Sequence, residues 1–136
     1  MRGLRLIVFA LSVGLFACGC GEDGTGADDY ESTVETFTGQ VVHNGEPVSF
    51  AEGEKAVLQL LYRPKAQRFG IPLAPDGTFT IGWMPVGKYT ASLERSKTSP
   101  ANGRRSSGGP YMIPGDFVIK EGKTEYTVEL GKNWQP

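Results

Sequence analysis

From residue 36 onward, short segments alternate hydrophobic and polar side chains and are separated by glycine and proline. A period of two places successive side chains on opposite faces of a strand. This pattern predicts strands over residues 36–42, 56–62, 78–81, 88–94, 117–120 and 124–130, edge strand 69–73, and a short strand or edge at 48–50. No window of helical period stands beside them. About seven short strands at this turn spacing predict an all-β, antiparallel sandwich.

The alternation also predicts which side chains fill the core. Two segments, 88–94 and 124–130, show it without interruption, and 78–81 shows it over a shorter length. Because every second residue of a half-buried strand faces inward, these three segments predict the inward side chains Phe79, Ile81, Tyr89, Ala91, Leu93, Tyr126, Val128 and Leu130.

Glycine and proline predict where the chain turns. Asn44-Gly45 readily takes positive φ, and Pro75-Asp76-Gly77 combines a fixed φ with a left-handed position. The segment Glu121-Gly122-Lys123 joins the last two predicted strands, and we expect a hairpin there.

The segment 95–110 interrupts this rhythm because it has one alanine and no larger hydrophobic side chain. We expect a long loop, which inside a compact domain is either functional or a solvated insertion. Its basic residues form a local positive patch, namely Arg95, Lys97, Arg104 and Arg105. One interpretation is that the patch engages an anionic partner such as a wall polymer.

The first eighteen residues have the order of a secretory signal, with a positive start, a hydrophobic run over 6–17 and then Cys18. Twelve residues are fewer than the ~20 that span a bilayer as a helix. Leu15-Phe16-Ala17-Cys18 resembles the lipobox of bacterial lipoproteins, whose cysteine becomes the lipid-carrying first residue of the mature protein. This predicts a signal peptide over 1–17 and lipidation at Cys18. The alternatives are a cleaved signal or an anchor helix without lipid.

Residues 18–35 are rich in glycine and acidic residues, so we expect a flexible tether. A calcium site built from its acidic side chains is the alternative. Removing residues 1–17 removes two of the 14 basic residues, Arg2 and Arg5, and no acidic one. Twelve basic residues then face 15 acidic ones, and the net charge moves from −1 to −3. An acidic domain without a basic stripe argues against a nucleic-acid partner.

Three stretches resemble the carboxypeptidase regulatory-like domains. They are Phe37–Val48 with its G-x-V…G-x-P-V order, Asp76–Ile81 with D-G-x-F-x-I, and Met84–Thr90 with P-x-G-x-Y. The segment 121–130 is like the last hairpin of small bacterial lipoproteins of this type. Together these matches cover residues 36–131, which leaves 132–136 as a C-terminal tail.

The resemblance implies a transthyretin-like Greek-key sandwich of seven strands without catalytic residues of its own. The implied protein is a non-catalytic, structural or interaction module, held to the membrane of the bacterial cell envelope by a lipid and facing the extracytoplasmic side. Its partner would be another envelope protein or a wall glycan. The alternative function is a carbohydrate- or peptide-binding module.

Candidate chemistry is sparse. His43 is the one histidine and falls in a predicted turn, so a Ser-His-Asp arrangement or a zinc site has too few groups. We therefore expect no enzyme activity, no metal and no cofactor. Trp83 and Trp134 are candidate binding residues together with Arg104 and Arg105, because exposed rings stack on sugars or partner side chains. Alternatively, Trp83 packs under the Pro85 turn and Trp134 covers one open end of the sandwich.

Overall fold

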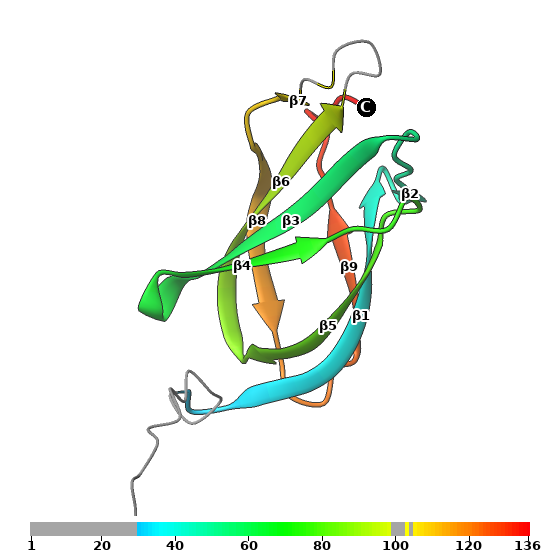
Figure 1. Ribbon diagram of the computed structural model, residues 1–136. Coiled ribbons are helices and arrows are strands. Elements are labelled where there is room, and N and C mark those ends of the chain that lie inside the picture. The colour runs from blue at the N-terminus through cyan, green and yellow to red at the C-terminus, as the bar shows by residue number, and fades with distance from the viewer. Residues whose placement is uncertain (1–29, 99–102, 104) are drawn as a thin grey trace, which may run out of the picture.

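A computed structural model describes residues 30–98, 103 and 105–136, and within them the chain is a sandwich of two β-sheets (Figure 1). One sheet contains β1 (Thr33–His43), β2 (Glu46–Pro47), β5 (Thr78–Pro85) and β9 (Glu125–Glu129). The other contains β3 (Glu54–Tyr62), β4 (Gln67–Pro72), β6 (Gly87–Thr98), β7 (Arg105–Ser107) and β8 (Tyr111–Ile119). A short 3₁₀ turn, Arg63–Lys65, joins β3 to β4. The predicted all-β sandwich is confirmed, with seven longer strands and two short ones among the described residues.

The inner faces of the two sheets form one hydrophobic core. Every side chain that the alternation predicted to face inward in 78–81, 88–94 and 124–130 is buried. Tyr89 lies at the centre, and its hydroxyl donates a hydrogen bond to the Pro85 carbonyl at 2.5 Å. Burial raises the pKa of Tyr89 well above its ordinary value, so this hydroxyl stays a neutral donor. The predicted central strand is also confirmed, since β3 pairs with β4 on one side and β6 on the other.

Strand β9 differs from the expected antiparallel hairpin. It pairs with β1 in parallel, with Thr38 opposite Glu125 and Val42 opposite Glu129, while β8 pairs with β6 in the other sheet. The segment 120–124 therefore crosses between the sheets instead of closing a hairpin. A short turn after a strand predicts a reversal, but the sequence does not say in which sheet the next strand pairs.

The predicted loop at 95–110 is in part strand. Residues 95–98 continue β6, and Arg105–Ser107 forms β7 against Ser96–Thr98. The backbone ladder with β3 runs on to the pair Glu54–Lys97, so this extension needs no hydrophobic side chains. Residues 99–102 and 104 lie outside the described part of the chain.

Two predicted boundaries are also corrected. Strand β1 begins at Thr33, inside the expected tether, because Val34 is buried opposite Met84 of β5. Residues 48–50 form no strand, since their amides bond singly to the Val41 and Pro75 carbonyls rather than to a ladder. The hydrophobic side chains of this segment, Val48 and Phe50, are buried nonetheless.

The predicted turns are present. Asn44 and Gly45 both have positive φ, at 52° and 81°. Gly77 has a φ of +77°, and a Cβ there would lie 2.5 Å from the Val48 carbonyl oxygen, so glycine is required on two grounds.

The carboxylate of Glu129 ties two turns at one end of the sandwich together. It accepts backbone N–H groups of Asn44 at 2.9 Å, Gly45 at 3.2 Å and Gly131 at 3.3 Å. These bonds, led by the one from Asn44, lower the pKa of Glu129 below its ordinary value. A carboxyl whose pKa is lower in the folded than in the unfolded state stabilises the fold at pH values above its unfolded-state pKa. This stabilisation is lost as the pH falls through the folded-state pKa.

We expect Glu129→Gln to lower stability at pH 7, because an amide oxygen is a weaker acceptor than a carboxylate. The stability difference from the wild type should shrink as the pH falls below the ordinary glutamate pKa of about 4.3. Urea melts of both proteins between pH 3 and pH 7 measure it. A difference that stays constant over this range would contradict the assigned role of the carboxylate.

Candidate functional site

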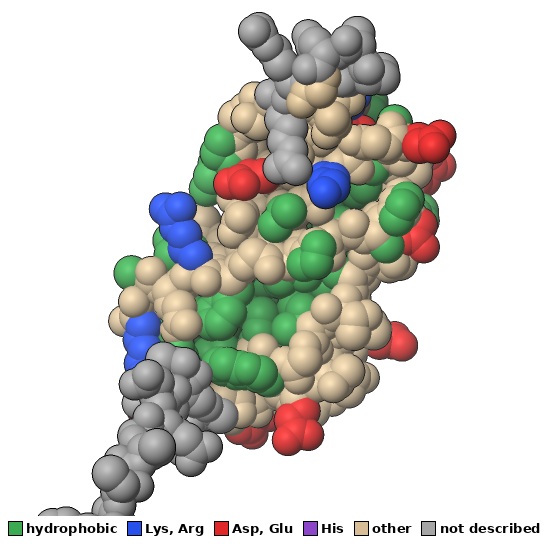
Figure 2. Space-filling view, viewed as in Figure 1, with side chains coloured by type: hydrophobic (Ala, Val, Ile, Leu, Met, Phe, Trp, Pro, Cys, Tyr) green, Lys and Arg blue, Asp and Glu red, His purple; other side chains and the backbone are tan. Residues whose placement is uncertain are grey.

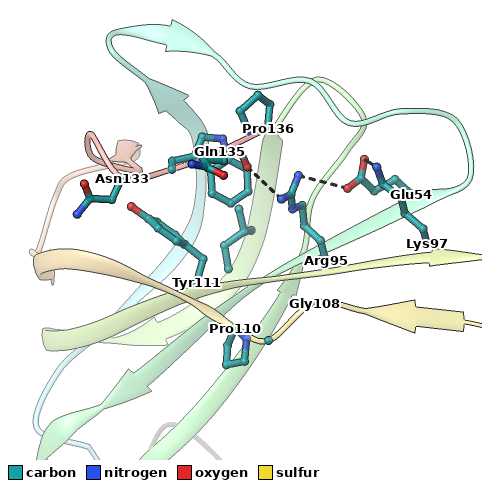
Figure 3. A pocket seen from close by; sticks show the side chains of 12 residues that line it. Glu54, Arg95, Lys97, Gly108, Pro110, Tyr111, Asn133, Gln135 and Pro136 are labelled. Carbon is teal, nitrogen blue, oxygen red and sulfur yellow. Dashed lines mark hydrogen bonds and ion pairs between the residues drawn. The ribbon is translucent and has the colours of Figure 1, made fainter.

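A pocket of about 450 Å³ lies between the end of β6, the segment before β8 and the C-terminal segment 133–136 (Figure 3). We call it the C-terminal pocket. Its walls combine charged, aromatic and small residues, and they are Glu54, Leu93, Arg95, Lys97, Gly108, Gly109, Pro110, Tyr111, Asn133, Trp134, Gln135 and Pro136. The wall formed by β6 carries both basic side chains, Arg95 and Lys97, so the pocket is a candidate site for a polar ligand.

Arg95 is the central side chain of this pocket. Its guanidinium donates from Nη2 to the Gln135 carbonyl at 3.1 Å and lies with Nη1 3.6 Å from Glu54 Oε1. The same group stands over the Trp134 ring, with Cζ 4.3 Å from the ring centroid. A planar cation on an indole face is a favourable cation–π contact. Arg95 therefore holds the C-terminal segment onto the sheet and still lines the pocket.

Glu54 supplies the buried negative charge behind the pocket. Only 5% of its side chain is exposed, and its Oε2 lies 3.3 Å from the Ala51 N–H and 3.8 Å from Lys97 Nζ. The other oxygen, Oε1, is buried and accepts no hydrogen bond within the described residues. One carboxylate thus faces two cations, Arg95 and Lys97. These three groups together have a net charge of +1. Lys97 is the more exposed of the two cations, with 62% of its side chain exposed.

Trp134 is a packing residue in this arrangement. It is only 5% exposed, with Arg95 over its ring and Tyr111 against its edge at a centroid distance of 5.2 Å. Tyr111 in turn donates its hydroxyl to the Leu130 carbonyl. The ring is therefore covered, and no sugar can stack on it without moving Arg95.

Trp83 lies at the other end of the sandwich and is 38% exposed. We expected Trp83 to pack under the Pro85 turn, but the ring contacts that the structure shows for it are with other elements. The ring centroids of Tyr30 and Phe69 lie 6.0 and 6.2 Å from it, and Tyr62 lies 5.8 Å from Tyr30. We call these four residues, Tyr30, Tyr62, Phe69 and Trp83, the tether-end aromatic surface.

The tether-end aromatic surface joins the two sheets where their edges are open. Phe69 belongs to β4 and Trp83 to β5, and within the described residues each of these strands is paired on one side only. Figure 2 shows a hollow lined by hydrophobic side chains between these strands.

The structure does not bring the predicted binding residues into one site. Trp83 lies opposite Glu35 near the start of β1, whereas Trp134 follows Leu130, whose N–H bonds to Val42 near the end of β1. Arg105 begins β7 opposite Thr98, while Arg104 and the predicted lipidation site Cys18 lie outside the described residues.

Glu54 is the pocket residue that the sequence did not single out. It stands just before the hydrophobic run of β3, where an acidic residue has no distinguishing signal. Only the pairing of β3 with β6 places it beside Arg95 and Lys97.

Other candidate chemistry is limited. His43 ends β1, with Nε2 3.3 Å from the Asn44 side-chain nitrogen. In residues 30–98, 103 and 105–136, no group of three His, Cys, Asp or Glu side chains is placed to hold a metal. The same residues contain no helix long and hydrophobic enough to cross a membrane.

The comparisons found similarity at the level of structure alone. No protein-family model matches the chain, and no curated protein matches it. A DUF3823 family protein from Bacteroides ovatus ATCC 8483 is 19% identical with a TM-score of 0.43, over 71% of this chain and 43% of that one. A DUF3823 family protein from Parabacteroides merdae ATCC 43184 is 17% identical with a TM-score of 0.36, over 71% and 44%. The chain thus spans under half the length of these two all-β neighbours, and at these scores neither informs the function.

The different surroundings of the two tryptophans predict different losses of stability. Trp134→Ala should cost about 3–5 kcal/mol, because it empties a buried site and removes the ring beneath Arg95. Trp83→Ala should cost roughly 1 kcal/mol, as expected for a partly exposed side chain. Urea melts of the two variants test this, each serving as the other's control. Equal losses would mean that the two rings are equally buried in solution.

Proposed function

We propose that the protein is a lipid-anchored, non-catalytic interaction module of the bacterial cell envelope, built on a domain of the carboxypeptidase regulatory-like type. Supporting this, a hydrophobic run of the kind found in leaders precedes Cys18 in the sequence, and the turns within the resembling stretches contain residues with positive φ, at Asn44, Gly45 and Gly77. The buried Tyr89 of the P-x-G-x-Y stretch anchors the adjoining turn through Pro85.

The observation that carries a binding role is the position and charge of the C-terminal pocket. The C-terminal segment that lines it lies at the end of the sandwich opposite to the start of β1 (Figure 1), so we expect the pocket to face away from a lipid attached to Cys18. Arg95 and Lys97 present cationic donors there, and Asn133 and Gln135 present amides. Charged and amide donors of this kind recognise carboxylates or phosphates on a polar chain. The ligand class we propose is an anionic envelope component, either a wall glycan or an acidic segment of another protein.

A second candidate function is the binding of carbohydrate or peptide at the tether-end aromatic surface. The observation in its favour is the exposure of Trp83, which is 38%, whereas Trp134 beneath Arg95 is only 5% exposed. Sugar rings stack on such faces.

Lipidation is tested by intact-mass measurement on protein from its own host or a bacterial expression host. We expect acyl groups on a chain that begins at Cys18 and fractionates with membranes. Cys18→Ser should abolish both, whereas the matched control Cys20→Ser should retain both. A wild-type chain that is cleaved elsewhere and carries no lipid would contradict the anchor.

Binding in the C-terminal pocket is tested with purified wall polymer immobilised on beads. Lys97→Gln should weaken retention about tenfold, because one hydrogen bond to a charged group contributes about 1.5 kcal/mol. Lys88→Gln is the matched control, since Lys88 is an exposed lysine at the opposite end of the same strand. Carboxyl-reduced polymer should bind wild type and Lys97→Gln alike. If neither the Lys97→Gln substitution nor the reduction of the polymer's carboxyl groups changes retention, anionic recognition in this pocket is contradicted.

A further inference from the structure

The tether-end aromatic surface has the composition of a membrane-interface site. Tyrosine and tryptophan rings favour the headgroup region of a bilayer because they are hydrophobic with one polar tip. Lys65 Nζ lies 4.1 Å from the centroid of the Tyr30 ring, and the β3–β4 turn that carries it also carries Arg63. Long basic side chains at such a boundary extend their charge toward lipid phosphates while their stems cover hydrophobic surface.

The basic turn is charge-complementary to a phosphate layer even after its internal pairing. Arg63 donates to Asp116 Oδ1 at 2.5 Å, with half of its side chain exposed, while Lys65 is exposed at the end of the same turn. Acidic residues stand nearby as well, since Glu31 and Glu35 are exposed on the β1 side. The attraction is therefore local to the β3–β4 turn, and the rings must contribute most of the contact.

The chain itself brings this surface to the lipid. Twelve residue steps separate Cys18 from Tyr30, and an extended chain covers at most ~3.3–3.6 Å per residue, so the lipid lies within roughly 43 Å of Tyr30. Tyr30 is itself part of the surface, in contact with Tyr62 and Trp83. A tether of this length holds the surface at high effective concentration beside the bilayer, so that individually weak contacts with lipid are sufficient for docking.

From these observations we infer that the tether-end aromatic surface docks on the phospholipid headgroup layer of the membrane that carries the anchor. This inference rests on the lipid anchor of the proposed function. The rings of Trp83 and Tyr30 enter the interface, and the basic turn around Lys65 contacts lipid phosphates. Docking covers the open hydrophobic hollow between β4 and β5 (Figure 2) and leaves the C-terminal pocket directed away from the bilayer.

The test is quenching of tryptophan emission by lipids with brominated acyl chains. The lipidated full-length protein is reconstituted in vesicles of phosphatidylethanolamine and phosphatidylglycerol, and vesicle flotation reports the anchor separately. We expect the exposed Trp83 to be quenched and the buried Trp134 to be unaffected. Trp83→Phe should abolish the quenchable share of the emission. Met112→Ser is the matched control, because Met112 is 58% exposed on β8 away from the aromatic surface, and it should leave quenching unchanged.

A second arrangement separates the docking from the anchor. Cys18→Ser protein with an N-terminal histidine tag, held on vesicles through nickel-chelating lipid, should show the same Trp83 quenching even if lipidation fails in the first experiment. In this arrangement, Lys65→Gln should reduce quenching at least twofold on anionic vesicles, and Lys132→Gln at the far end should not. If the protein floats with the vesicles in either arrangement but Trp83 stays unquenched, the surface does not dock on the membrane. The result would then favour a glycan or peptide as its ligand.

Discussion

The parallel pairing of β9 with β1 is the constraint on which the arrangement of both candidate surfaces depends. Strand β1 starts beside Tyr30, and β9 runs in the same direction along it, so the chain finishes at the far end of the sandwich. An antiparallel last strand would have returned the C-terminal segment toward the tether. Because β1 has eleven residues at about 3.3 Å each, the two ends are separated by roughly 36 Å. In the proposed arrangement, one end meets the membrane and the other a ligand.

Each end uses aromatic residues, but their environments differ. At the C-terminal pocket, Arg95 covers Trp134 and is held by Glu54, so the indole becomes part of the fold and the cations form the surface. At the tether end, β4 and β5 leave their edges open, and Trp83 closes the gap only partly with Phe69. The difference in exposure between the two tryptophans therefore comes from their neighbours.

Much of the fold could be predicted from alternation and turn residues, because both act locally. The inward faces of Tyr89, Leu93 and Tyr126 follow from a period of two, and the Asn44-Gly45 turn from positive φ. Strand pairing could not be predicted, since alternation determines which side chains face inward but not which strand lies alongside. The pocket depends on this pairing, because only the register of β3 with β6 brings Glu54 beside Arg95 and Lys97. The same ladder makes residues 95–98 a strand despite their polar sequence.

The central claim is that the anchored domain keeps one orientation, with its tether end at the bilayer and its pocket away from it. Resonance energy transfer from a fluorophore on the domain to acceptor lipids measures this most directly, using Lys123→Cys or Asn133→Cys in a Cys20→Ser background. Ten residues of nearly extended chain separate these sites by about 25–30 Å. We predict strong transfer from position 123 and weak transfer from position 133. Equal transfer from both positions would show that the domain tumbles freely on its tether and would contradict the account.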